Sequence, residues 1–143
     1  MEKLSPVKSE SDLTIQKDKV PTGLKVFFIL HFIVDTGFGI PFVFLTRTMH
    51  ELFHLPTENL ILGRMFGAAM IAIGGVSILV IKDKLDSFKS LLKLKLLWSA
   101  SAIVGIGISL NENFHDSYFF AFSFFVLFFV VWSYYYFKLF RPY

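Results

Sequence analysis

The sequence predicts an all-α integral membrane protein, a four-helix up-down bundle with its N- and C-termini in the cytosol. Of the 143 residues, 55% are hydrophobic and only 17% are charged, and the mean hydropathy is +0.62. Soluble domains carry about 25% charged residues, so this surface is too apolar for water. Four apolar runs each have about 20 residues, the length that crosses the hydrocarbon core as a helix. Nearly all basic residues flank these runs on one side, which indicates a fixed orientation.

Residues 1–23 form a polar segment in which lysines alternate with acids and serines. No apolar periodicity runs through it, so we expect a disordered cytosolic tail. The rest of the chain, 24–143, is then one transmembrane domain.

Helices are expected for the four apolar runs, because a backbone in lipid must satisfy its own hydrogen bonds. The runs do not alternate between apolar and polar residues, which argues against a barrel. Lys93 and Lys95 interrupt the start of the third run. An alternative is therefore an interfacial helix from Lys84 to Lys95 with a shorter buried segment after it. The expected spans are 24–45, 60–81, 91–110 and 118–137.

The basic residues predict which side of the membrane each connection faces. Of the 14 lysines and arginines, all but Arg47 and Arg64 lie in or next to the tail, the connection between the second and third spans, or the C-terminus. An even number of spans brings these three segments to one side, so we expect them in the cytosol. The net charge of +3 is then a topology signal, and no nucleic-acid partner is expected.

Small residues on the second and third spans predict where helices pack closely, because lipid supplies no hydrophobic drive between helices. We expect these two faces to meet inside the bundle. The alternative is a homodimer contact through Gly63 and Gly67, which have GxxxG spacing. The candidate packing residues are Gly63, Gly67 and Gly74 on the second span and Ser101, Gly105 and Ser109 on the third.

Asp35 lies near the middle of the first span, where a charge costs about 2.5–3.5 kcal/mol by insertion scales. His31 precedes it by four residues and shares its helix face. Gly37, Gly39 and Pro41 follow and predict that this helix kinks or ends early. Three interpretations stay open: a structural contact of Asp35 with Arg64 or His31, a ligand or proton site formed by His31, Asp35 and Arg64, or no joint role.

The first connection contains His50-Glu51-Leu52-Phe53-His54, an HExxH pattern. On a helix, its two histidines would share a face and could hold zinc, with Glu51 as general base. A further ligand would come from the third connection, where His115 is the candidate. The alternative is a short interfacial helix from Thr48 to Leu55.

The arrangement resembles small four-helix multi-pass membrane proteins of unassigned function. The segment from His31 to Asp35, followed by Pro41, is also similar to the opening helix of the EXPERA (emopamil-binding) group. These are four-helix proteins of the endoplasmic reticulum that handle sterols and related amphiphiles. The resemblance implies that Asp35 contacts a cationic or hydroxyl-bearing amphiphile, and it implies an endoplasmic reticulum membrane. The group's further acidic residues in later helices have no counterpart here, so sterol isomerisation is not implied.

Other catalytic patterns are missing from the sequence, which has no cysteine, no GxSxG elbow and no phosphate-binding glycine loop. The leading expectation is therefore a structural or accessory membrane protein that works in the lipid bilayer through contacts with other membrane proteins or with a second copy. The alternatives are binding or transport of a small amphiphile or proton, and a zinc enzyme. No other cofactor is expected.

Overall fold

In the computed structural model, residues 20–112 and 114–140 are described, and this part of the chain is helical with no strand. Most of the segment expected to be a disordered tail lies outside the described residues. The helices are α2 (Thr22–Phe44), α3 (Thr46–Leu52), α4 (Leu60–Leu79), α5 (Leu85–Glu112) and α6 (Asp116–Phe140). Four of them, all except α3, are long and apolar enough to cross a membrane.

The third span differs from its expected limits. Its helix, α5, begins at Leu85 and runs without a break to Glu112. Lys93 and Lys95 therefore lie inside one continuous helix, and the alternative of a separate interfacial helix is wrong. At 1.5 Å per residue, Lys95 lies about 15 Å from the start of α5.

The first span keeps nearly its expected limits, and α2 does not end early at Pro41. The helix continues to Phe44, and the Leu45 N–H donates to the Pro41 carbonyl over 2.7 Å. Thr46 then starts α3 at once, and its hydroxyl donates to the Phe42 carbonyl over 2.7 Å. These two hydrogen bonds thus stabilise the end of α2 after the proline, which has no N–H group of its own to donate.

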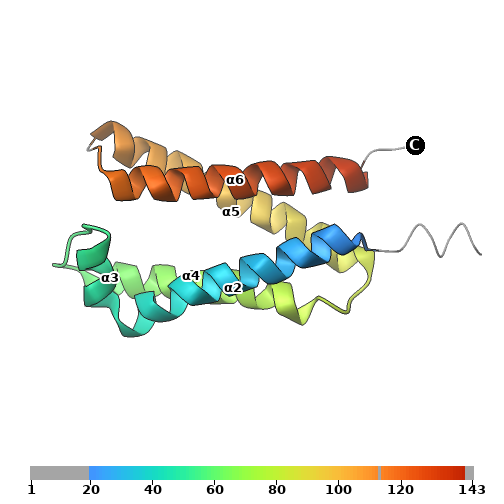
Figure 1. Cartoon of the computed structure of the whole chain (residues 1–143), viewed down its shortest axis with the longest axis horizontal. Coiled ribbons are helices and arrows are strands. Elements are labelled where there is room, and N and C mark those ends of the chain that lie inside the picture. Colours follow the sequence, from blue (N-terminus) through green and yellow to red (C-terminus); the bar gives the residue numbers. More distant parts are fainter. Residues whose placement is uncertain (1–19, 113, 141–143) are drawn as a thin grey trace, which may run out of the picture.

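The long helices form two pairs, α2 with α4 and α5 with α6, and neighbouring helices run in opposite directions (Figure 1). Glycines make the first pair tight. A Cβ built on Gly67 would lie 2.7 Å from the Gly39 carbonyl oxygen, and one on Gly39 would lie 2.8 Å from that of Gly67. Only residues without a side chain allow two helix backbones to approach this closely.

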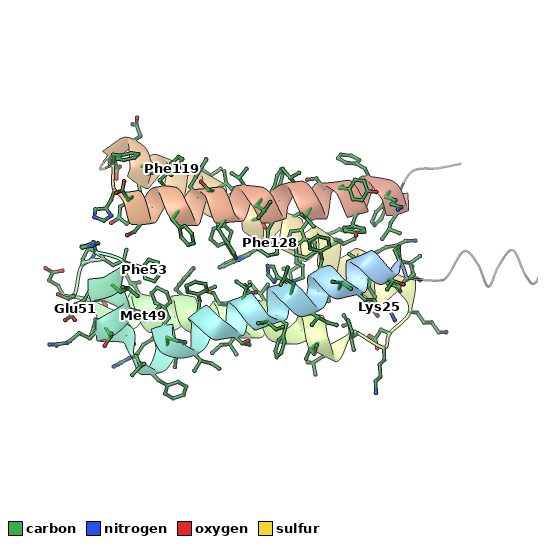
Figure 2. The ribbon with its side chains drawn as sticks, viewed as in Figure 1. Lys25, Met49, Glu51, Phe53, Phe119 and Phe128 are labelled. Carbon is green, nitrogen blue, oxygen red and sulfur yellow. The ribbon has the colours of Figure 1, made fainter. Side chains whose placement is uncertain are left out.

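The two pairs meet at the end of the molecule that carries Lys25 (Figure 2). Large side chains from α2, α5 and α6 interlock there in an aromatic cluster. Phe28 packs against both Phe88 and Trp132, with ring centroids 4.9 and 5.6 Å away. The buried members of this cluster are Val20, Leu24, Phe28, Leu85, Phe88, Leu92, Phe128, Trp132 and Tyr135.

Candidate functional site

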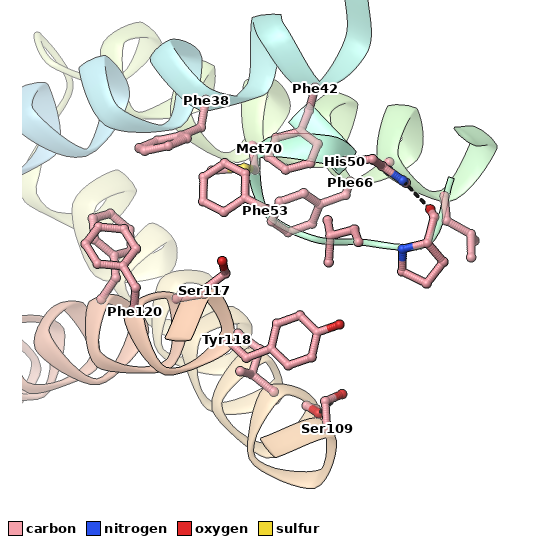
Figure 3. Close-up of a pocket in the computed structure, with 18 of the residues that line it drawn as sticks. Phe38, Phe42, His50, Phe53, Phe66, Met70, Ser109, Ser117, Tyr118 and Phe120 are labelled. Carbon is pink, nitrogen blue, oxygen red and sulfur yellow. Dashed lines mark hydrogen bonds between the residues drawn. The ribbon is translucent and has the colours of Figure 1, made fainter. Parts of the chain in front are cut away.

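A cavity of about 510 Å³ separates the two helix pairs at the opposite end, near α3 (Figure 3). Most of its wall is apolar. Phe38, Phe42, Phe66 and Met70 come from the α2–α4 pair, and Phe120, Phe124 and Phe125 come from α6. Ligand cavities typically have volumes of about 300–1,000 Å³ and mainly apolar walls, so the size and lining suit a small molecule.

Polar groups line the cavity at one end only, close to the connections. Glu58 and Asn59 immediately precede α4, Ser109 lies in the last turn of α5, and Ser117 and Tyr118 lie in the first turn of α6. The cavity is therefore amphipathic. Aromatic side chains line most of it, and hydrogen-bonding groups line the end beside the connections, which we call the mouth.

Small residues on α5 help to leave this space open. Gly105 lines the cavity, and a Cβ built on it would meet no atom within 4 Å. Leu62 and Phe120, which also line it, are 64% and 59% exposed. These exposed wall residues indicate that the space opens to the surroundings at its sides.

His50 has a structural place beside the mouth. It is buried, and its Nδ1 lies 2.5 Å from the Pro56 carbonyl oxygen, to which it donates (Figure 3). Its Nε2 lies against Gly63 and has no hydrogen-bond partner among the described residues. The His50 ring thus holds the connection between α3 and α4 against the end of α4.

The alternative of a zinc site from His50, Glu51 and His54 is not formed in the described residues. The α3 helix ends at Leu52, and His54 follows with a left-handed backbone, φ 54°. The two histidines therefore do not share a helix face, and Glu51 is exposed. The described residues contain no group of three or more His, Asp or Glu side chains that could hold a metal ion.

His54 instead meets His115, the other metal candidate, with ring centroids 4.6 Å apart. His115 accepts a hydrogen bond at Nδ1 from the Ser117 N–H over 3.2 Å. The contact joins the connection after α3 to the one before α6. It therefore links the two helix pairs at the cavity end.

A buried polar cluster lies between the cavity and the aromatic cluster. It consists of His31 and Asp35 on α2 and Lys95 on α5. The His31 Nδ1 is 3.0 Å from the Lys95 Nζ and 2.9 Å from the Asp35 Oδ2. All three residues are at least 96% buried. The Lys95 Nζ also lies 5.2 Å from the ring centroids of Phe28 and Trp132, in cation–π geometry.

Arg64, the third residue of the candidate intramembrane site, does not join this cluster. Its neighbour Gly63 packs against Thr46, whereas Asp35 packs against Gly74, which lies ten residues beyond Arg64 along α4. That separation is about 15 Å along the helix. Arg64 is exposed and makes no ion pair within the described residues. The expected contact of Asp35 with His31 is present, and the one with Arg64 is not.

Lys95 is the member of the cluster that sequence reasoning missed, because it was counted with the basic residues that flank a span. Helical register could have revealed it. Phe88, Leu92, Lys95 and Ser99 follow at spacings of four, three and four, and all four are buried on one face of α5. A lysine on that face, well inside a continuous helix, requires a polar partner.

The candidate packing residues divide into two groups. Gly63, Gly67 and Gly74 are buried against α2 and α3, so they are not available for a homodimer contact. The α5 residues Ser101, Gly105 and Ser109 are exposed. The two faces therefore do not meet, and Gly105 and Ser109 line the cavity opposite Gly63. The expectation was wrong because the α4 glycines pack against the helix that precedes them in the chain.

Comparison of the chain with protein-family models, with curated proteins and with solved structures gives no match. The similarity of the first helix to the EXPERA group therefore stays a prediction. The class of protein is defined by the fold alone: a helical protein with four long apolar helices, compatible with a multi-pass membrane protein.

Proposed function

We propose that the chain is a multi-pass membrane protein that binds a hydroxyl-bearing amphiphile between its two helix pairs. The observation that carries the proposal is the amphipathic cavity of about 510 Å³. An aromatic body matches an alkyl chain or a ring system, and the polar mouth matches a small neutral headgroup. This binding role has more support than the accessory role expected from the sequence.

The residues that the fold leaves exposed support placement of the four long helices across a bilayer. Ile33, Phe44, Met65, Leu79 and Leu97 are each more than half exposed, and all are apolar. Such a surface drives a protein out of water, whereas lipid solvates it. The exposed apolar residues come from α2, α4 and α5, and α6 adds Leu127 and Val130.

We place the end that carries Lys25 in the cytosol, because Lys82, Lys84 and Lys138 lie at the same end of the helices. The chain has no cysteine, so single introduced cysteines report topology without background. In sealed right-side-out vesicles, Glu58→Cys should react with an impermeant maleimide, and Lys84→Cys should react only after permeabilisation. The opposite pattern would reverse the orientation.

The charge at the mouth favours a neutral ligand over an anionic one. Glu58 is the charged residue of the lining, and neither lysine nor arginine contributes to it. The hydroxyls of Ser109, Ser117 and Tyr118 can donate to and accept from an alcohol. A carboxylate or phosphate would instead meet the Glu58 carboxylate.

The test uses the full chain in phosphatidylcholine nanodiscs and a long-chain alcohol that carries a photoactivatable diazirine. We expect labelling of peptides that line the cavity, with competition by the unlabelled alcohol. The matched probe is a fatty acid with the same chain and diazirine, which should label these peptides less. Equal labelling of all lipid-facing peptides by both probes would contradict the binding site and favour the accessory role.

A pair of glycine variants makes the test specific. Gly105→Phe places a ring in the cavity, and Gly75→Phe places one on α4 where a Cβ also meets no atom within 4 Å. Gly75 does not line the cavity. We expect Gly105→Phe to lower labelling about tenfold, equivalent to 1.4 kcal/mol of binding free energy. Gly75→Phe should leave it unchanged, and equal losses in both variants would contradict the assignment.

A further inference from the structure

The His31 Nδ1 contacts two partners that make opposite demands on it. Lys95 Nζ is a donor, so its hydrogen bond requires a lone pair on Nδ1. The Asp35 carboxylate is an acceptor, so its hydrogen bond requires a proton on Nδ1. Both atoms lie within 3.0 Å, yet one ring nitrogen can satisfy only one of them at a time.

We propose that His31 is an intramembrane proton-binding site that exchanges one hydrogen bond for another. Without the extra proton, Nδ1 accepts from Lys95 and ties α2 to α5. When a proton from water binds to Nδ1, His31 becomes an imidazolium and donates to Asp35, one turn further along α2. The tie between helix pairs is then replaced by a bond within one helix.

The hydrogen bonding of the cluster supports two arrangements of this kind. In the structure, the Lys95–His31 hydrogen bond is present, and the Asp35 Oδ2 is buried without a hydrogen-bond partner among the described residues. Proton binding to Nδ1 supplies the donor that this oxygen lacks. Buried polar atoms without partners are rare and call for an explanation.

Lys95 has alternative neighbours once it loses its acceptor. The Ser99 hydroxyl lies one turn further along the same face of α5 and is also buried without a partner in the described part of the chain. The rings of Phe28 and Trp132 already lie at cation–π distance from the Lys95 Nζ. Both protonation states therefore leave the lysine with stabilising contacts.

The surrounding helices add no competing charge among the described residues. On α4, Gly74 packs against Asp35. On α6, the rings of Phe128 and Trp132 lie edge-on to His31, with centroids 4.8 and 5.3 Å away. The titratable groups that face His31 are thus Asp35 from its own helix and Lys95 from α5. A proton that binds to His31 therefore acts on this three-residue cluster.

The position of the cluster links this exchange of hydrogen bonds to the separation of the helix pairs. It lies between the aromatic cluster, which locks the pairs together, and the cavity, where they are apart. Loss of the α2–α5 hydrogen bond releases a buried side-chain hydrogen bond between the two pairs. We therefore expect proton binding to widen the separation of the pairs at the α3 end, whether or not the cavity holds an amphiphile.

The first experiment observes the proton itself, by solid-state NMR of the ¹⁵N-histidine-labelled chain in phosphatidylcholine nanodiscs. His31→Asn identifies the His31 signals. The pH is lowered from about 8 to about 4, a range that brackets the ordinary histidine pKa, and we expect Nδ1 to be unprotonated at neutral pH and both ring nitrogens to be protonated at acidic pH. An Nδ1 already protonated at neutral pH, or unchanged over this range, would overturn the proposal.

The second experiment measures the helix pairs with spin labels, which the cysteine-free chain accepts at introduced cysteines. Labels at the exposed residues Phe44 on α2 and Phe119 on α6 report the distance across the cavity. Labels at Phe44 and Leu79 report the α2–α4 pair alone. We expect acidification to lengthen the first distance and to leave the second unchanged.

The control variant is His31→Asn, whose Oδ1 can accept from Lys95 near the Nδ1 position but cannot be protonated in this range. It should keep the Phe44–Phe119 distance constant with pH. A pH-dependent lengthening that persists in this variant would overturn the role of His31. If the variant does not fold, the NMR of the unmodified histidine decides the proposal alone.

Discussion

The two ends of the molecule hold the helix pairs in different ways. At the Lys25 end, rings from three helices interlock, and Phe28, Phe88 and Trp132 have no exposed surface. At the α3 end, the walls of the cavity stand apart and Phe120 is more than half exposed. The same two pairs are therefore fixed at one end and separable at the other.

With the long helices across a bilayer, as proposed, the difference shows what holds helices together in lipid. Apolar side chains gain nothing from leaving lipid for a neighbouring helix, so association depends on shape and on polar contacts. The fixed end has both, through its interlocked rings and the nearby Lys95–His31 hydrogen bond. The cavity end has loop contacts, such as His54 with His115, and an apolar space that a ligand can fill.

The largest effect should come from removing a ring at the fixed end. Trp132→Ala empties a fully buried site, and we expect it to lower the free energy of unfolding by about 3 kcal/mol. Phe120→Ala, at the cavity end, should change it by less than about 0.5 kcal/mol. Unfolding by sodium dodecyl sulfate in mixed micelles measures both. Equal losses would contradict the distinction between the two ends.

A smaller effect is expected within the α2–α4 pair. Gly67→Ala places a methyl group against the Gly39 carbonyl oxygen, 2.7 Å away in the present backbone, and should destabilise the protein by about 2 kcal/mol. Gly75→Ala adds the same methyl group where no atom lies within 4 Å. Because alanine favours helix over glycine, this control should be neutral or stabilising. The same micelle assay would expose the prediction as wrong if both variants behaved alike.

The smallest effect concerns the start of α4, beside the cavity mouth. The Asn59 side chain accepts from the Ile61 N–H over 3.2 Å. Asn59→Ala should weaken the first turn by about 1 kcal/mol and speed amide exchange there, without changing exchange near Lys25. Asn111→Ala, at an exposed position late in α5, is the control. Faster exchange throughout the molecule would show that the two ends do not respond independently.

Much of the helical structure could be predicted from the sequence, because long apolar runs in lipid form helices whatever their partners. The second span begins at the expected Leu60, and the first and second helices end within two residues of expectation. The third helix was expected to begin six residues late. Hydropathy had excluded its lysine-containing first turns, whose apolar faces are buried in the aromatic cluster.

The partners of each helix could not be predicted in the same way. Sequence spacing indicates which residues share a helix face, as for His31 with Asp35. Glycines on a face do not indicate which other helix that face contacts. Lys95 therefore remained unassigned, and Arg64 was chosen because it is basic and near a span end. The cavity could not be predicted either, because it depends on where the two helix pairs are not in contact.

With the long helices across a bilayer, as proposed, the burial of Lys95 has a consequence for how the chain enters the membrane. A lysine deep in α5 and an aspartate deep in α2 each oppose insertion by about 2.5–3.5 kcal/mol. The two residues come together through His31 only after α4 has been made between them. During synthesis, α2 therefore holds an acid whose counterpart has not yet emerged from the ribosome. We expect α2 to settle in the bilayer late, at the moment when α5 arrives.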